Sequence, residues 1–314
     1  MTRRRHQKEK QSHVCLLVNR SATGYSRRPI DKLTRAIKKA GGYYSVFEPE
    51  SAIDLFHTAQ QVCGLRRWRR TVPQQFDRRG KVTALVACGG DGTFNLVARA
   101  ALEAELPAGA LPMGRYNNIA HSLYGTTDAD TAIGRIMRRD YRLIDCATAA
   151  DQLFFGSIAM GLIPRLAREL DNRKPPRFGF GWGKLGARAA TEVENKKMII
   201  KIDAFRFDVS PVVLNINLLP YSLGLPFSPA SIFDDGRAEV ILNFGVDSKS
   251  LSSFIGQVYN KKYVYGSEVR LFRGHTIGIQ PAKGRTLYLD GELIKLPANL
   301  IEIIVGEKQL KAFC

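Results

Sequence analysis

The chain has 314 residues, 45% of them hydrophobic and 24% charged, which is the composition of an ordinary globular protein. This length exceeds that of one typical core and favours two domains. No apolar run approaches the length of a membrane span, and the charged N-terminus has no secretory signal, so a transmembrane or exported protein is not expected. The five scattered cysteines have no metal-ligand spacing and fit the reduced thiols of a cytoplasmic protein.

The net charge of +18 is unevenly distributed along the chain. Residues 1–81 contain 19 Lys and Arg against 6 Asp and Glu, and the densest part is the segment 66–70, followed by 78–81. Such a basic patch would attract anionic lipid headgroups or nucleic acid, and it would serve equally well as a solvated face. Because no base-reading module is present, no specific nucleic-acid partner is expected.

The first half of the chain alternates between strand and helix patterns. Residues 1–12 are predicted to form a disordered basic tail, and 64–80 a basic surface loop. Strands are predicted at 14–18, 43–47, 82–87 and 108–112, and helices over 30–40, over 52–62, from 93 and from 117. Strands that alternate with helices form parallel sheets with right-handed crossovers. We therefore expect residues 13–143 to form an α/β domain of three layers.

The second half has shorter apolar runs separated by turns. Strands are predicted at 153–159, 197–207, 212–219, 238–244, 276–280 and 286–289, with one helix over 251–259. This pattern predicts a mostly antiparallel β-sandwich over residues 144–299. The segment 174–184 interleaves glycines with Phe178, Phe180 and Trp182, which is typical either of a mobile apolar lid or of a loop that caps the core.

The most informative motif is Cys-Gly-Gly-Asp-Gly-Thr-Phe-Asn at residues 88–95, directly after the buried run at 82–87. Glycines let backbone N–H groups approach an anion closely, and a helix N-terminus that follows them favours phosphate. Asp91 is suited to hold a hydrated Mg²⁺ beside those phosphates. The same residues also make a good tight turn without any ligand.

Three further turns follow in a fixed order. Residues 111–120 contain a second glycine turn that opens a helix, while 233–240 and 287–294 contain the acidic turns Asp-Asp-Gly and Asp-Gly-Glu. Together with the first motif, these segments resemble the diacylglycerol kinase catalytic family, which includes bacterial lipid kinases and sphingosine and ceramide kinases. NAD kinases share part of the pattern. Each acidic turn is also typical of a hairpin that needs no function.

The resemblance implies a two-domain protein that binds ATP and Mg²⁺ between its domains, with residues from about 300 to 314 completing the first domain. Leu300–Val305 is the segment expected to return there. The residues that match nucleotide-binding positions of the family are Asn19, Gly24, Gly89, Gly90, Asp91, Gly92, Thr93, Gly114, Arg115 and Asn117. Asp290 matches the general base, accompanied by Glu292. Asp234 or Asp235 matches the ligand of a second, structural Mg²⁺, in addition to Asp91.

Three positions depart from the family pattern. Arg115 stands where a small hydroxyl residue is usual, Asn118 replaces an acid, and Leu96 stands where Glu is common. A guanidinium at 115 would either clamp a phosphate or obstruct the usual nucleotide pose. The departures leave nucleotide preference and the level of activity open.

The leading hypothesis is a kinase that transfers the γ-phosphate of ATP to a hydroxyl of a lipid, of the diacylglycerol or sphingoid type. The protein is expected to be cytoplasmic and peripheral at the membrane, bound through its basic patch, and a homodimer is an open possibility. The alternatives are a kinase of a soluble acceptor, similar to NAD kinase, and a catalytically weak sensor of nucleotide or anionic lipid.

Overall fold

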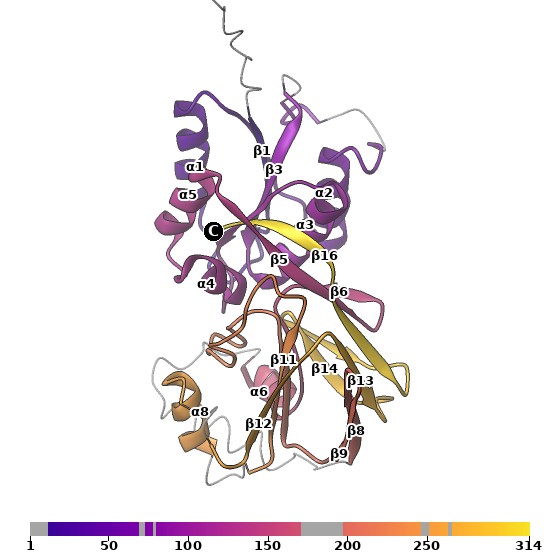
Figure 1. Ribbon diagram of the computed structural model, residues 1–314. Helices are drawn as coiled ribbons and strands as arrows, with labels where there is room; N and C mark the ends of the chain where they lie inside the picture. Colours follow the sequence, from indigo (N-terminus) through magenta and orange to yellow (C-terminus); the bar gives the residue numbers. More distant parts are fainter. Residues whose placement is uncertain (1–11, 69–72, 78–79, 171–196, 246–250, 263–265) are drawn as a thin grey trace, which may run out of the picture.

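The computed structural model describes residues 12–68, 73–77, 80–170, 197–245, 251–262 and 266–314. Figure 1 shows two parts that stack end to end, with a helix-rich domain above a strand-rich one. No helix among the described residues is both long enough and apolar enough to cross a membrane.

The first domain alternates strands and helices, as predicted. Its elements are β1 (His13–Val18), α1 (Arg27–Lys39), β2 (Tyr43–Phe47), α2 (Ala52–Val62), β3 (Val82–Gly89), α3 (Asp91–Glu103), β4 (Ala108–Pro112), α4 (Asn118–Tyr124) and α5 (Ala129–Arg138). The strands are parallel in the order β2-β1-β3-β4. Helix α1 packs with α5 and α2 packs with α3, on opposite sides of the sheet, which gives the three layers (Figure 1).

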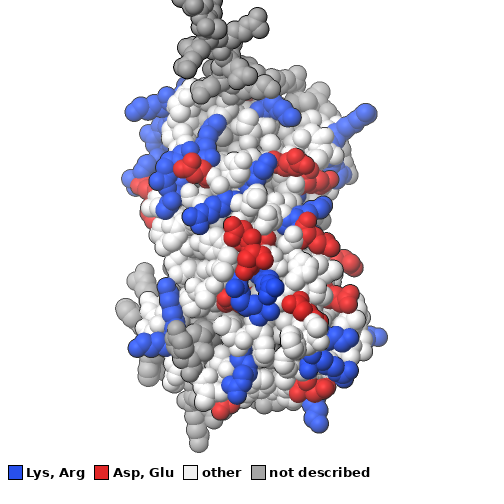
Figure 2. Space-filling view, in the orientation of Figure 1, with Lys and Arg blue, Asp and Glu red and all other residues white. Residues whose placement is uncertain are grey.

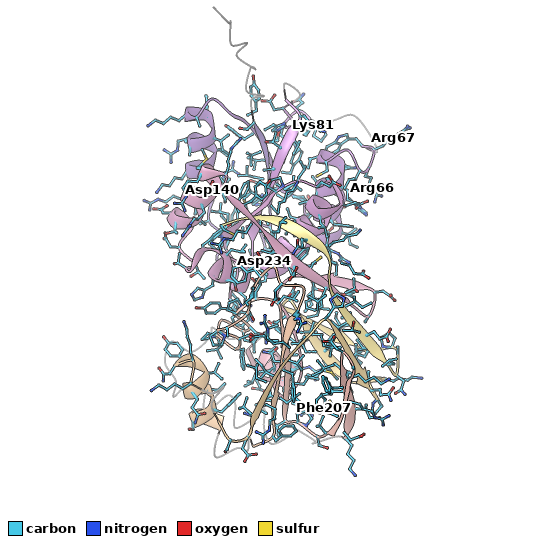
Figure 3. All side chains as sticks on the ribbon, viewed as in Figure 1. Arg66, Arg67, Lys81, Asp140, Phe207 and Asp234 are labelled. Carbon is cyan, nitrogen blue, oxygen red and sulfur yellow. The ribbon has the colours of Figure 1, made fainter. Side chains whose placement is uncertain are left out.

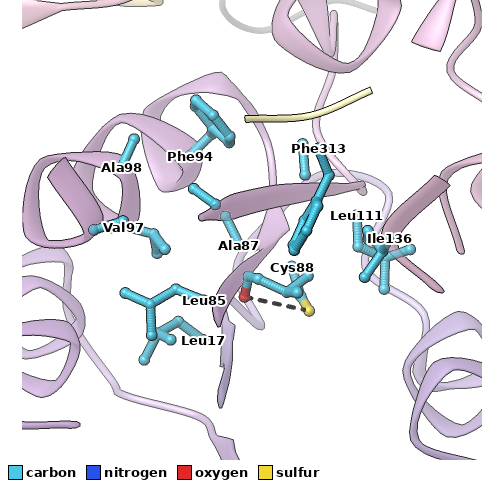
Figure 4. Close-up of a cluster of buried hydrophobic side chains, with 14 of the residues drawn as sticks. Leu17, Leu85, Ala87, Cys88, Phe94, Val97, Ala98, Leu111, Ile136 and Phe313 are labelled. Carbon is cyan, nitrogen blue, oxygen red and sulfur yellow. Dashed lines mark hydrogen bonds between the residues drawn. The ribbon is translucent and has the colours of Figure 1, made fainter. Parts of the chain in front are cut away.

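The core of this domain forms because β1 and β3 are aliphatic and covered on both faces, as expected of inner parallel strands. In Figure 4, Phe94 and Val97 of α3 lie on one side of the central strands, and Leu111 and Ile136 lie on the other. The packing of β3 in this core positions its carboxyl end, and the first glycine turn begins there.

The second domain consists mainly of antiparallel strands. Its elements are β5 (Tyr141–Ala149), β6 (Gln152–Phe154), β7 (Ser157–Gly161), α6 (Leu162–Leu170), β8 (Met198–Ile202), β9 (Phe205–Val209), β10 (Val213–Asn217), β11 (Ala238–Asn243), α8 (Leu251–Tyr259), β12 (Val269–Gly274), β13 (Thr276–Gln280), β14 (Thr286–Leu289), β15 (Glu292–Lys295) and β16 (Ile301–Phe313). One sheet, which we call the inner sheet, has the order β12-β11-β10-β7-β14-β15. A buried aliphatic cluster joins the inner sheet to β8, β13, β5 and β16, which confirms the sandwich.

Strand β16 connects the two domains. Residues 301–304 pair with β13 of the second domain, whereas Ala312 pairs in parallel with Ala108 of β4. The chain therefore returns to the first domain further along than Leu300–Val305, the segment that was expected to do so. Between these two ends β16 runs antiparallel to β5, with an irregularity between Val305 and Gln309.

Some elements differ from the sequence-based expectations. Helices α5 and α6 and strands β5 and β12 were not predicted. The runs 153–159 and 197–207, each predicted as one strand, are divided between two strands. Trp68 and Phe76, the aromatic residues in and beside the basic segments, pack beside Phe47, with ring centroids 5.9 Å and 6.3 Å from it. The segment 174–184 lies outside the described residues, as do 69–72 and 78–79.

Phe313→Ala tests the docking of β16. Phe313 is 3% exposed and belongs to the core of the first domain. Loss of its ring is expected to lower the free energy of unfolding by about 3–5 kcal/mol. Phe205→Ala makes the same change at a side chain that is 69% exposed and is expected to cost less than about 0.5 kcal/mol. Urea denaturation of both variants makes the comparison, and equal losses would contradict this account of β16.

Candidate active site

A cavity of about 410 Å³ lies where the carboxyl ends of the parallel strands meet the second domain. In the first domain it is lined by segments that are far apart in the sequence: the turn after β1, the start of α2, the start of α3 and the turn after β4. The lining residues are Asn19, Ser21, Ala22, Thr23, Pro49, Glu50, Ser51, Ala52, Leu55, Gly90, Gly92, Thr93, Leu96, Gly114, Arg115 and Glu292. Of these, Glu292 alone comes from the second domain.

Seven of the predicted site residues line this cavity: Asn19, Gly90, Gly92, Thr93, Gly114, Arg115 and Glu292. The segment 49–55 also lines it but was not predicted, because its Pro-Glu-Ser-Ala sequence is typical of any helix start. Ser51 is the residue of this segment that signals a helix start in the sequence. It caps α2 by accepting a hydrogen bond from the Asp54 N–H at 3.1 Å.

The two glycine turns touch each other. A Cβ atom at Gly114 would lie 2.3 Å from the Cα of Gly90, so the turns can meet only without side chains. The side chain of Asn117 stabilises the second turn through two hydrogen bonds. Its Oδ1 accepts the Gly114 N–H at 2.7 Å, and its Nδ2 donates to the Gly114 carbonyl at 3.0 Å. Asn117 adopts a φ of 52°, a left-handed conformation that Asn tolerates. It therefore supports the cavity without lining it.

Gly24 and Gly89 support the same turns. The Gly24 N–H donates to the Met113 carbonyl at 2.8 Å, which ties the first turn to the second. A Cβ at Gly89 would lie 2.3 Å from Thr93 Oγ1, and that hydroxyl accepts a hydrogen bond from Asn19 Nδ2 at 3.1 Å. The clash at Gly89 requires glycine there, whereas a Cβ at Gly24 would make a tight contact of 3.1 Å with the Met113 carbonyl oxygen.

The start of α3 gives the cavity its electrostatic character. Gly90 is the N-cap residue and has no side chain to cap the helix, so the first-turn N–H groups have no side-chain acceptor there. Gly90, Gly92 and Thr93 all line the cavity. A helix N-terminus of this kind favours an anion such as phosphate.

Asp91 points toward α4. Its Oδ1 accepts the Ile119 N–H at 2.9 Å and its Oδ2 accepts Asn118 Nδ2 at 3.1 Å. Burial raises the pKa of Asp91 to about 6, and the charge of Asp290 adds to the shift. Asn118 also accepts the Gly224 N–H at 2.8 Å, so one amide links Asp91 to the second domain. A carboxylate at position 118 would repel Asp91 and has no proton to donate to it.

Asp290 lies behind the cavity, in the turn between β14 and β15. Its Oδ2 accepts Asn95 Nδ2 at 3.0 Å and the Phe155 N–H at 2.7 Å. Its Oδ1 accepts the N–H groups of Gly156 at 2.9 Å and Ser157 at 2.8 Å. Burial raises the pKa of the Asp290 carboxyl, and the four donors oppose that shift. The donors occupy the four lone-pair positions of the carboxylate.

The turn that contains Asp234 and Asp235 does not line the cavity. Asp235 pairs with Arg273, and the turn is held by Asp145, whose Oδ2 accepts the Gly236 N–H at 2.7 Å. Figure 3 shows Asp234 near the junction of the two domains. Among the described residues, no three His, Cys, Asp or Glu side chains gather as a metal site would require. The predicted ligands Asp91, Asp234 and Asp235 therefore do not form a preassembled metal cage.

The basic segment around residue 66 lies away from this site. In Figure 3, Lys81 lies at the end of the first domain that is remote from the second, with Arg66 and Arg67 to one side. On the face shown in Figure 2, Lys and Arg are spread over both domains with acidic residues among them. The cavity itself contains one of these cations, Arg115.

Comparison with known proteins agrees with this arrangement. Residues 13–149 match the family model of the diacylglycerol kinase catalytic domain. No protein of curated function matches the chain. Among solved structures, a putative diacylglycerol kinase from Bacillus anthracis str. Sterne is 18% identical, with a TM-score of 0.75, over 99% of this chain and 98% of that one.

A diacylglycerol kinase from the same strain is 15% identical, with a TM-score of 0.70, over 98% of both chains. At these identities the likeness concerns the fold, and it extends over both domains. The resemblance found in the sequence is thus confirmed: residues 13–149 match the diacylglycerol kinase catalytic domain, and both domains share the fold of these solved structures.

Proposed function

We propose that the protein is an ATP- and Mg²⁺-dependent kinase that transfers the γ-phosphate to a hydroxyl group of a lipid. The observation that carries the proposal is the shared cavity, in which the glycine turns of the first domain face Glu292 of the second, with Asp290 two residues away along the chain. Phosphoryl transfer requires a phosphate cradle, a divalent metal and a group that orients the acceptor hydroxyl.

The residues of the cavity suit a nucleotide. The uncapped start of α3 presents backbone N–H groups to phosphate oxygens, since no Cβ stands between them at Gly90 and Gly92, whereas the Gly114 N–H of the second turn is bonded to Asn117. Arg115 adds a fixed positive charge with fork geometry. Phosphoryl transfer depends largely on such positioning and charge compensation.

Mg²⁺, when bound with the nucleotide, would neutralise charge on the phosphate oxygens. It usually keeps several waters and takes one or two protein carboxylates, so the lack of a preassembled cage among the described residues is compatible with it. Asp91 and Glu292 are the carboxylates beside the first glycine turn that we propose as its ligands. The second metal site at Asp234 or Asp235 remains a prediction.

Asp290 is proposed as the general base. An acceptor hydroxyl needs a free lone pair on this carboxylate, and the structure has donors on all four. Three of the donors are backbone N–H groups of one turn, whereas the fourth is the side chain of Asn95. We infer that Asn95 releases Oδ2 when the acceptor binds, and that the hydroxyl takes its position.

The four donors on the Asp290 carboxylate also favour a second function, that of a sensor. A carboxylate whose lone pairs are all occupied, together with Arg115 in the cavity, also suits a protein that binds nucleotide or anionic lipid and turns over slowly. The lipid acceptor and the peripheral location at a membrane rest on the family of the catalytic domain and on the net charge of +18.

Transfer of labelled γ-phosphate from ATP with Mg²⁺ tests the proposed function, with total lipid extract and a soluble metabolite pool as separate acceptors. Label is expected in the organic phase, and Asp91→Asn is expected to abolish it. Label confined to the aqueous phase would support a kinase of a soluble acceptor. Nucleotide binding with no label in either phase would support the sensor.

Gly114→Ala tests the contact between the glycine turns. The added Cβ would lie 2.3 Å from the Cα of Gly90, so one turn has to shift. We expect a loss of about 1–3 kcal/mol in the free energy of unfolding and a Kd for ATP raised about tenfold or more. Calorimetric titration with ATP measures the affinity.

Gly134→Ala is the matched control, since nothing lies within 4 Å of its added Cβ in the middle of α5. It is expected to raise stability by about 0.5–1 kcal/mol and to leave ATP affinity unchanged. Equal ATP affinities in the two variants would contradict the proposed cradle.

The raised pKa of Asp91 predicts the pH dependence of stability. The folded carboxyl titrates at about 6 and the unfolded one at its ordinary value of 3.8. Between these values the folded protein keeps a proton that the unfolded chain has lost, so the free energy of unfolding falls as the pH rises through this window and then levels off. Asp91→Asn, which cannot titrate, is expected to show a weaker fall in urea denaturation series between pH 4 and 7. Parallel curves would argue against a buried, titrating Asp91.

A further inference from the structure

The acidic turn at residues 233–236 forms part of the junction between the two domains. Phe233 packs against the core of the first domain, whereas β11, the strand that follows the turn, belongs to the inner sheet of the second. A Cβ atom at Gly306 would lie 2.8 Å from the Cα of Gly236, so the turn also lies directly against β16 at its irregularity. Whatever holds this turn therefore holds the junction.

On one side the turn is held by Asp145, a buried residue of β5. The Asp145 Oδ2 accepts the Gly236 N–H at 2.7 Å, and its Oδ1 accepts Nε2 of Gln309, on β16, at 2.8 Å. The backbone N–H of Asp145 donates to the Phe233 carbonyl at 2.6 Å. Both carboxylate oxygens of Asp145 thus face the positive hydrogens of N–H groups, which a metal ion beside them would repel.

On the other side the turn is bonded to a cation of the chain itself. The Asp235 Oδ2 accepts Nη2 of Arg273, and its Oδ1 accepts the Arg237 N–H at 3.2 Å. The Arg273 Nε lies 3.9 Å from Glu239 Oε1, and the other oxygen of Glu239 accepts the Ser228 hydroxyl. One guanidinium therefore compensates two carboxylates, one from the turn and one from the sheet.

The inner sheet sets the position of this guanidinium. Arg273 of β12 is directly opposite Glu239 of β11 in the antiparallel register, and opposite charges that face each other in this way stabilise the pairing of the strands. Glu239 is 3% exposed, and a carboxylate this deeply buried requires a partner of opposite charge. The cation is thus placed by the backbone ladder, in reach of Asp235.

The second Mg²⁺ predicted from the sequence at Asp234 or Asp235 does not fit this arrangement. Mg²⁺ requires a near-octahedral shell of oxygens at about 2.0–2.1 Å. Both oxygens of Asp235 accept hydrogen bonds, and the Gly236 carbonyl oxygen lies 3.1 Å from His275 Nδ1. Asp234 is exposed, and within the described part of the chain no three acidic, His or Cys side chains gather as metal ligands. A metal ion at Asp235 would have to displace Arg273.

We propose that Arg273 is the permanent cation of this turn and replaces the second Mg²⁺ that the resemblance to the diacylglycerol kinase family implies. The guanidinium has a fixed charge and belongs to the chain, so it is present at every Mg²⁺ concentration. Its planar fork of donors suits two carboxylates at once. The junction between the domains therefore needs no divalent metal.

Thermal unfolding without nucleotide tests this proposal, in millimolar MgCl2 and in EDTA at equal ionic strength. The melting temperature of the wild-type protein is expected to agree within about 1 °C between the two solutions. Arg273→Met keeps an apolar stem and removes the charge, which leaves Asp235 and the buried Glu239 without their cation. In EDTA it is expected to lower the melting temperature by about 4 °C or more.

Arg206→Met is the matched control, because it makes the same change at an ion pair on β9. Arg206 and Asp208 have side chains that are 58% and 74% exposed, with Nε and Oδ2 3.7 Å apart. Loss of such a pair is expected to leave the melting temperature within about 1 °C of the wild type. Equal melting temperatures of Arg273→Met and Arg206→Met would overturn the role of Arg273.

Asp235→Asn decides where any metal binds. A melting temperature of the wild type that rises by about 3 °C or more with MgCl2, with the rise lost in Asp235→Asn, would overturn the proposal. A rise that Asp235→Asn retains would assign the metal to another site and support it. If Arg273→Met does not fold, the wild type and Asp235→Asn decide alone. Because the experiment contains neither ATP nor lipid, failure of the proposed kinase function would leave its result unchanged.

Discussion

The structure depends on one buried carboxylate, that of Asp290. A buried charge is unfavourable unless hydrogen bonds compensate it, and here the donors come from two other segments: α3, through Asn95, and the turn between β6 and β7. The carboxylate thereby fixes the β14–β15 hairpin, and with it Glu292, against the helix that starts at the first glycine turn. These contacts place Glu292 beside the start of α3, where it lines the cavity.

A second link runs through Asn118, one of the three positions that depart from the diacylglycerol kinase pattern. Its amide donates to Asp91 and accepts from Gly224 at the same time, which an ionised carboxylate at this position could not do. The glycine turn, α4 and the second domain are therefore connected without an additional charge. From the sequence alone, Asn118 in place of an acid left the level of activity open. In the structure this residue has a role, because it avoids placing a further carboxylate beside Asp91.

Local patterns predicted much of the fold. The helix at 52–62, the strand at 108–112 and the strand that ends at the first glycine turn follow from periodicity and turn residues. Strand β16 was recognised only in part, since Gly306 with a φ of 76° and the polar residues after it interrupt its apolar pattern. Helix α6 was missed because it follows β7 directly, with no linking turn. Asn95 carries no local signal, and it meets Asp290 across 195 residues of sequence.

The central claim is that Asp290 acts as the base of a phosphoryl transfer. It is tested most directly by the single-turnover rate at which Asp290→Asn transfers the γ-phosphate of ATP to dioctanoylglycerol, measured well below the melting temperature of the variant. The account predicts a rate about 10²–10⁴ times lower than that of the wild type, with the Kd for ATP unchanged. Transfer by the folded variant at the wild-type rate would contradict it and would leave Asp290 a purely structural role.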